Sequence, residues 1–146
     1  MESRTRETEA GAAVQAPAAE ASPGVRRVLF VDDEPSLLAA LRRMLFRQRS
    51  RWDMTFAPGG AAALQAMQSE PFHVVITDMQ MPVMDGAALL REVHEQYPRT
   101  ALLVLSGYAD AGTTTSASSL ARQILTKPCD PQTLITAIDK ALASVV

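Results

Sequence analysis

The sequence has little of several residue types that mark particular protein classes. Its one cysteine, Cys129, excludes a disulfide within the chain and fits a reducing cytoplasm. Aromatic residues make up 5% of the 146 residues, which leaves few rings on which nucleic-acid bases could stack. The formal net charge is -2 and no basic stripe is visible, so we expect no nucleic-acid surface in this chain.

Long apolar runs are missing as well. No stretch reaches the roughly 18 residues that a membrane-spanning helix needs, and the N-terminus lacks the apolar core of a secretory signal. We therefore expect a cytoplasmic protein without a membrane partner. With 47% hydrophobic and 21% charged residues, a chain of this length suits one domain with one good core.

Residues 1–24 differ in composition from the rest of the chain. They are rich in Ala, Glu, Pro, Ser and Thr, and Val14 is their only large aliphatic residue after Met1. Such a segment buries too little apolar surface to offset the loss of chain entropy. We predict a disordered N-terminal tail over 1–24, either without a role or serving as a tether, and one folded domain over 25–146.

Beyond the tail, short apolar runs alternate with helical patterns. Strands are predicted at 28–31, 52–57, 72–77, 101–105 and 123–126. Helices are predicted from Pro35 onward, over 60–69 and 86–97, and after Asp130, which is expected to cap the last one. The segment 109–121 should hold a crossover helix that is short, late-starting or mobile. The alternation predicts an α/β fold, a doubly wound parallel sheet of five strands.

Polar side chains stand where four of these strands end. Asp32 and Asp33 follow the first strand, Asp78 the third, Ser106 the fourth and Lys127 the fifth. Open α/β sheets bind ligands outside the carboxyl ends of their strands. A hard cation such as Mg²⁺ prefers oxygen ligands and relieves the repulsion between neighbouring carboxylates. The three acids therefore predict a Mg²⁺ site at this edge of the sheet.

The same residues suit the transfer of a phosphoryl group. A carboxylate such as that of Asp78 can act as the nucleophile and form an aspartyl phosphate. The metal, the ammonium of Lys127 and the hydroxyl of Ser106 can then neutralise charge on the transferring group. The backbone carbonyl of Gln80 could complete the protein's share of the metal ligands.

Four motifs, in their order and spacing, resemble the receiver domain of two-component response regulators of the chemotaxis-regulator type. They are Val31-Asp32-Asp33-Glu34-Pro35, the run from Thr77 to Gly86, Leu105-Ser106-Gly107 and Thr126-Lys127-Pro128. The resemblance extends from about Val25 to Val146 and leaves only the N-terminal tail outside. It implies a flavodoxin-like sheet with the strand order 2-1-3-4-5.

The resemblance also implies a role for each residue of the site. Asp78 matches the phosphoacceptor, Asp32 and Asp33 match the acidic pair that holds Mg²⁺, and the carbonyl of Gln80 matches a third protein ligand. Ser106 matches the hydroxyl residue that moves toward the phosphate. Lys127 matches the lysine beside it, whose bond to Pro128 is expected to be cis. The phosphoryl donor would be a phosphohistidine on a histidine kinase or a phosphotransfer protein.

A protein of this kind is a signalling phosphoacceptor rather than an enzyme with its own substrate. Its output would pass through protein partners or through a C-terminal domain missing from this chain. Receivers can also form homodimers through their last strands and helices. One position departs from the family pattern, because Ile124 stands where an aromatic ring commonly turns inward on activation. Tyr108 is the candidate substitute.

Other interpretations remain open from the sequence. A Mg²⁺-dependent phosphatase of the haloacid dehalogenase type also uses an aspartate nucleophile, but it usually has a second aspartate at the place of Gln80. A pseudo-receiver would keep the fold only as a docking module. Asp32 or Asp33 could also simply cap the following helix. The arginines from Arg42 to Arg51 are expected to form a solvated helix face, with docking of a partner as the alternative.

Overall fold

The computed structural model describes residues 26–79, 81, 86–107 and 119–144. The tail over 1–24, Gln80, Tyr108 and most of the predicted crossover helix at 109–121 lie outside these ranges. The described part of the chain contains all five predicted strands and the other four predicted helices.

The five strands form one parallel sheet in the order β2-β1-β3-β4-β5. They are β1 (Arg26–Val31), β2 (Trp52–Ala57), β3 (Val74–Asp78), β4 (Ala101–Ser106) and β5 (Gln123–Thr126). Because neighbouring strands are parallel, each connection must return along the sheet before the next strand begins. The α/β class, the doubly wound sheet and the strand order are confirmed.

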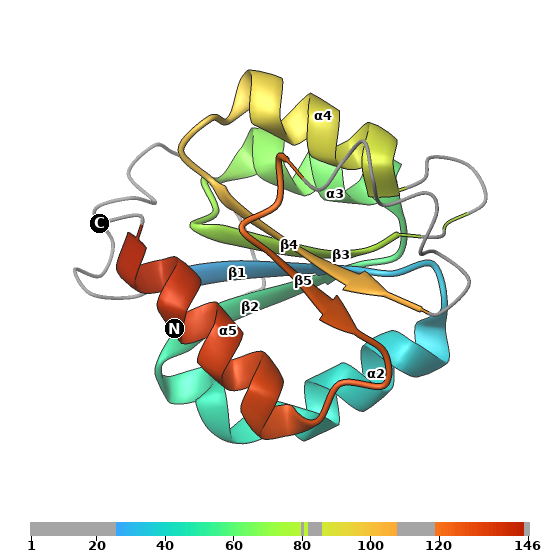
Figure 1. The fold of residues 1–146 in the computed structure, drawn as a ribbon, viewed down its shortest axis with the longest axis vertical. Coiled ribbons are helices and arrows are strands. Elements are labelled where there is room, and N and C mark those ends of the chain that lie inside the picture. Colours follow the sequence, from blue (N-terminus) through green and yellow to red (C-terminus); the bar gives the residue numbers. More distant parts are fainter. Residues whose placement is uncertain (1–25, 80, 82–85, 108–118, 145–146) are drawn as a thin grey trace.

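Helices cover both faces of this sheet (Figure 1). One face carries α2 (Pro35–Met44) and α5 (Pro131–Ser144), and the other carries α3 (Gly60–Ser69) and α4 (Gly86–Gln96). A short 3₁₀ helix, η1 (Phe46–Ser50), lies between α2 and β2. Among the described helices, none is both long and apolar enough to cross a membrane.

Each face of the sheet has its own hydrophobic core. Val28 and Phe30 of β1 belong to the core under α2 and α5, whereas Leu29 and Val31 belong to the core under α3 and α4. This period of two follows from the pleat of the strand. All residues of β3 and β4 are buried, which is why these two strands read as nearly continuous apolar runs.

The structure corrects the predicted bounds of three strands, of which β4 only gains Ser106 at its end. β1 begins earlier than predicted, at Arg26, and β3 spans Val74–Asp78 rather than 72–77. Phe72 precedes the strand and packs into the core beside α3 and α4. Its carbonyl oxygen accepts the hydroxyl of Thr100 at 2.9 Å instead of joining the sheet ladder. Phe72 was predicted to belong to the strand because it directly precedes an apolar run, but it is a core residue outside the sheet.

Two of the helices that follow strand ends, α2 and α5, start differently. At α5, Asp130 Oδ2 accepts the backbone N–H of Thr133 at 3.2 Å, so the predicted cap is confirmed. At α2 the N-cap residue is Glu34, and no side chain of the described residues caps the helix. Capping by Asp33 is therefore wrong. Asp32 accepts the N–H of Glu34 at 3.0 Å, just outside the helix.

Arg27 and His73 are joined by two hydrogen bonds at the amino ends of β1 and β3. The backbone N–H of Arg27 donates to Nδ1 of His73 at 3.0 Å, and the N–H of His73 donates to the carbonyl oxygen of Arg27 at 2.9 Å. Burial lowers the pKa of His73, and the charges of Arg26 and Arg27 lower it further. An imidazole that accepts a hydrogen bond at Nδ1 must be neutral.

We predict that His73 makes the stability of the fold depend on pH. Because its pKa is lowered in the folded state, the unfolded chain binds more protons below the ordinary value of about 6.5. The stabilisation should be fully present above that pH. It should be lost as the pH falls toward the folded-state pKa, with a slope of at most about 1.4 kcal/mol per pH unit.

Urea unfolding at several pH values between about 7.5 and 5 measures this slope. His73→Asn keeps an acceptor oxygen for the N–H of Arg27 but cannot titrate, so its profile should be flatter. His94→Asn, on the exposed side of α4, is the matched control and should keep the wild-type slope. Identical profiles for all three proteins would contradict the assignment.

Candidate functional site

Three carboxylates meet where β1 and β3 end. Asp32 and Asp33 follow β1 directly, and Asp78 is the last residue of β3, the neighbour of β1 in the sheet. One oxygen atom from each carboxylate lies within 4.8 Å of the other two. Asp32 is 2% exposed and Asp78 is 4% exposed, whereas Asp33 is half-buried. The structure thus brings together the three acids predicted as metal ligands.

Burial and crowding make the charged form of this cluster costly. Burial is the main reason that the pKa of Asp32 is raised above its ordinary value. The N–H of Glu34 and the charge of Lys127 lower that pKa, while the charges of Asp78 and Asp33 raise it again. The balance remains a raised pKa. A positive charge placed among the three oxygens would therefore favour the ionised carboxylates.

Lys127 provides part of the missing positive charge. Its Nζ lies 2.6 Å from Oδ1 of Asp78, and its bond to Pro128 is cis, as the resemblance implied. Oδ1 is buried and receives no hydrogen bond of ordinary geometry from the described residues, so the contact is an ion pair. Three carboxylates and one ammonium leave two negative charges uncompensated when all are ionised.

This donor set fits the hard divalent cation predicted from the sequence. Mg²⁺ binds through one or two carboxylates and keeps several of its waters. Two buried acids and a half-buried one offer such oxygens within 4.8 Å of one another. Soft or nitrogen ligands are absent from the described residues of the cluster, which disfavours zinc or copper. The fourth predicted ligand, the carbonyl of Gln80, lies outside the described residues.

Ser106 lies at the neighbouring strand end, on the side of Lys127. It pairs with Thr126 in the register of β4 and β5, and its carbonyl oxygen accepts the N–H of Lys127 at 2.9 Å. Its side chain is buried, and its hydroxyl donates to the carbonyl oxygen of Gly107 at 3.3 Å. This is a long local bond, so little is lost when the hydroxyl turns to another acceptor.

Gly86 holds the backbone of Asp78 in place, a role that sequence reasoning missed. Its N–H donates to the carbonyl oxygen of Met79 at 2.9 Å. A Cβ atom on Gly86 would lie 2.5 Å from the carbonyl oxygen of Asp78 and 2.7 Å from Cα of Met79, which no side chain tolerates. The hydroxyl of Thr77 donates to the same carbonyl at 2.9 Å. The sequence signal was a glycine at the very start of an apolar helix.

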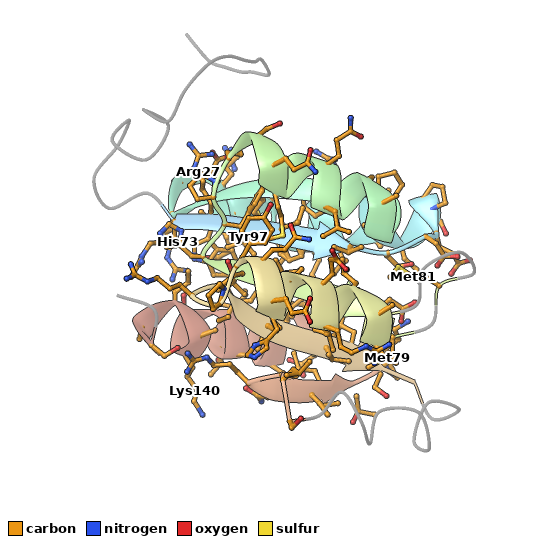
Figure 2. The ribbon with its side chains drawn as sticks, turned by 90° about the horizontal axis from the view of Figure 1, so that it is seen from above. Arg27, His73, Met79, Met81, Tyr97 and Lys140 are labelled. Atoms are coloured by element: carbon orange, nitrogen blue, oxygen red, sulfur yellow. The ribbon has the colours of Figure 1, made fainter. Side chains whose placement is uncertain are left out.

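The residues next to Asp78 point into the core and anchor the loop. Met79 is 3% exposed and Met81 is 7% exposed, and both pack with α3 and α4. Figure 2 shows them at one end of the molecule, with Arg27 and His73 at the opposite end. The chain after β3 is thus fastened by two buried side chains on either side of Gln80.

Ile124, which replaces the usual aromatic residue, lies on the edge strand β5. It pairs with Val104 and is 38% exposed, whereas its neighbour Leu125 is buried. The exposed position agrees with the expectation that it belongs to the surface formed by the last strands and helices. Tyr108, the proposed substitute, lies outside the described residues.

Comparisons with known proteins agree with this geometry. The sequence model of the response regulator receiver domain matches residues 28–139. A protein-glutamate methylesterase/protein-glutamine glutaminase of Cereibacter sphaeroides is 33% identical over 105 residues, which cover 70% of this chain and 28% of that protein. The response regulator receiver protein CpdR of Brucella abortus is 28% identical over 119 residues, which cover 81% of this chain and 98% of that protein.

Solved structures show the same fold. A response regulator receiver domain protein from Clostridium thermocellum matches with a TM-score of 0.75 at 29% identity, over 82% of this chain and 95% of that one. The chain therefore spans little more than a quarter of the methylesterase relative, but nearly the whole of CpdR.

We predict that Asp32→Asn stabilises the metal-free protein. The amide keeps the acceptor for the N–H of Glu34 but removes a buried charge with a raised pKa, so the Tm without divalent ions should rise by a few degrees. Millimolar Mg²⁺ should raise the Tm of the variant less than that of the wild type.

Calorimetry with and without Mg²⁺ measures both effects of Asp32→Asn. Glu95→Gln, an exposed charge removal on α4, serves as the control and should change neither value. A destabilised Asp32→Asn protein with an undiminished response to Mg²⁺ would show that this carboxylate has another role.

We predict that Gly86→Ala displaces the backbone of Asp78. The added methyl group has no room beside two backbone atoms, so the free energy of unfolding should fall by about 1–3 kcal/mol. The response of the Tm to Mg²⁺ should also weaken, because the carboxylate of Asp78 moves with its backbone. Urea unfolding measures the loss of stability, and calorimetry with and without Mg²⁺ measures the weaker response. A variant with wild-type stability would contradict the close contact between Gly86 and the backbone of Asp78 and Met79.

Proposed function

Because this chain belongs to the response regulator receiver domain family, we propose that it accepts a phosphoryl group on Asp78 and thereby changes its contacts with protein partners. The donor is a phosphohistidine on a histidine kinase or a phosphotransfer protein. The observation that carries the proposal is the buried Oδ1 of Asp78, 2.6 Å from the ammonium of Lys127 at the meeting point of three acids.

Asp32, Asp33 and Asp78, together with the backbone carbonyl of Gln80, would hold the Mg²⁺ ion. When bound, the ion supplies positive charge beside the phosphoryl oxygens. The raised pKa of Asp32 supports this assignment, because a carboxylate whose ionisation is costly gains most from a neighbouring cation. Asp33 is half-buried and lacks a role as a helix cap, which also supports a role as ligand.

In the transfer, one oxygen of the Asp78 carboxylate attacks the phosphorus. The bond between the phosphorus and the donor histidine nitrogen breaks, and its electron pair stays on that nitrogen. The products are an acyl phosphate on Asp78 and a free histidine on the donor. A carboxylate needs no general base to become a nucleophile, so positioning and charge neutralisation are the main tasks of the protein.

Lys127 and Ser106 neutralise the new group. The ammonium of Lys127 already faces Asp78 and can keep contact with an oxygen of the phosphoryl group after transfer. The hydroxyl of Ser106, which donates to the carbonyl of Gly107 at 3.3 Å, can turn and donate to another oxygen. Movement of Ser106 toward the phosphoryl group would shift the backbone at the end of β4. The neighbouring strand β5 would then change its surface contacts.

The output is proposed to lie in protein contacts. The methylesterase relative extends far beyond the region that this chain matches, so a further domain or a separate partner protein would receive the signal. The exposed Ile124 on β5 is a candidate contact in a homodimer or a complex with such a partner. Because Ile124 has no ring, the readout would depend on Ser106 and its neighbours rather than on a ring flip.

Labelling by acetyl phosphate tests the proposal. With Mg²⁺, intact-mass measurement should find one phosphoryl group per wild-type chain, and none after chelation of the metal or in Asp78→Asn. Lys127→Gln should slow labelling about 100-fold, the scale for loss of one charge-stabilising group. Lys140→Gln removes an exposed lysine on α5 and should leave the rate unchanged. Labelling at another residue, or steady hydrolysis of p-nitrophenyl phosphate, would contradict the assignment.

A further inference from the structure

Five exposed arginines lie close together in the sequence, between the last turn of α2 and the start of β2. They are Arg42, Arg43, Arg47, Arg49 and Arg51, from the end of α2, from η1 and from the residue before β2. We call them the arginine patch. No acidic residue stands between Glu34 and Asp53 in the sequence, so the patch carries five positive charges in a chain of net charge -2.

The position of the patch follows from the sheet register. Trp52, which directly follows Arg51, pairs with Arg26, the first residue of β1. The part of the patch around Arg51 therefore lies at the amino end of β2, whereas Asp78 lies at the carboxyl end of β3. The guanidinium of Arg42 lies farther along the sheet, over Phe56 in the second half of β2. Figure 1 shows the same separation, since α2 runs from the carboxyl end of β1 back along the sheet to η1. A partner bound to the patch would leave Asp78 accessible.

Three guanidinium groups of the patch are held over aromatic rings. The distances to the ring centroids are 4.4 Å for Arg42 over Phe56, 3.7 Å for Arg49 over Phe46 and 5.1 Å for Arg51 over Trp52. A guanidinium over a ring face is partly immobilised, while the in-plane N–H groups that it does not already use can bind a carboxylate. Arg49 donates to the carbonyl oxygen of Phe46 at 3.0 Å, and Arg51 donates to Gln48 and, at 2.6 Å, to Asp139. Part of the side-chain entropy that binding would remove is thus already lost.

Most of this charge has no carboxylate partner in the described residues. Arg51 pairs with Asp139 at 2.6 Å. No carboxylate of the described ranges lies within ion-pair distance of the other four arginines. Apolar surface lies beside them, because Phe46 is 55% exposed and Met44 is 36% exposed. The patch therefore combines uncompensated guanidinium groups with a small apolar area.

We propose that the arginine patch docks an acidic segment of a partner protein. Asp or Glu side chains of that segment would form paired hydrogen bonds with the guanidinium groups. An apolar side chain between the acids would cover Phe46 and Met44. This is an interaction surface separate from the phosphoacceptor site, and it does not depend on the chemistry at Asp78.

The surroundings of the patch favour a narrow acidic polypeptide over other polyanions. The carboxylates of Asp53 and Asp139 border the patch and are about half exposed, so a duplex or a bilayer would bring its phosphates against them. Single-stranded nucleic acid gains most of its sequence-tolerant affinity from stacking on ring faces. Here Arg49 covers the face of Phe46, and Trp52 is 2% exposed.

Fluorescence anisotropy with a short labelled peptide of Glu-Glu-Leu repeats tests the proposal. The full chain should bind this peptide and not its Gln-Gln-Leu counterpart. Arg43→Glu combined with Arg47→Glu alters two arginines that, among the described residues, neither stack on a ring nor form an ion pair, so the fold should hold. This double variant should weaken binding at least about tenfold. Phe46→Ala should weaken it a few-fold, because the peptide leucine loses its apolar contact.

Arg91→Glu combined with Arg99→Glu is the matched control. It makes the same change of net charge at two exposed arginines outside the patch and should change the affinity less than about twofold. The Arg43/Arg47 variant should keep Mg²⁺-dependent labelling of Asp78, which separates this proposal from the preceding one. Equal loss in the control, no preference for the acidic peptide, or tighter binding of oligothymidine or phosphatidylserine vesicles would each overturn it.

Discussion

The repulsion among Asp32, Asp33 and Asp78 is the constraint on which the rest of the structure depends. Parallel pairing of β1 and β3 sets Val31 opposite Thr77, so the acids that follow them emerge at the same level of the sheet. Three carboxylate oxygens within 4.8 Å would separate if their backbones could move. They stay together because the strands beneath them are buried on both faces, and the resulting cost of ionisation creates an affinity for positive charge.

The residues around Asp78 keep its backbone from moving away from the other two acids. The hydroxyl of Thr77 donates to its carbonyl oxygen, Gly86 packs closely against that oxygen, and Met79 is buried in the core directly after it. Relief must come instead from added charge, of which Lys127 supplies one unit. A change in the charge of Asp78 therefore alters the repulsion among the three acids and their attraction to Lys127.

The two ends of the sheet carry different chemistry. The carboxyl ends bring acids together around a lysine, and near the amino end of β2 two arginines, Arg49 and Arg51, are held over aromatic rings. Helix α2 joins them, beginning next to the acids and ending in the arginine patch. Its Leu38 is buried, so this helix is packed against the rest of the domain between the two regions. Under the two proposals made above, phosphoryl transfer would take place at Asp78 and a partner would bind at the arginine patch.

The sequence by itself determined the fold class, the order of the elements and the residues at the strand ends. Strands β2 and β5 and helix α3 have the predicted bounds, because apolar runs and helical periods are local properties of the chain. Only the tertiary structure decided how close the acids lie, that Lys127 pairs with Asp78, and that Gly86 must lack a side chain. These features depend on the register between segments far apart in the chain, and local periodicity contains no information about that register.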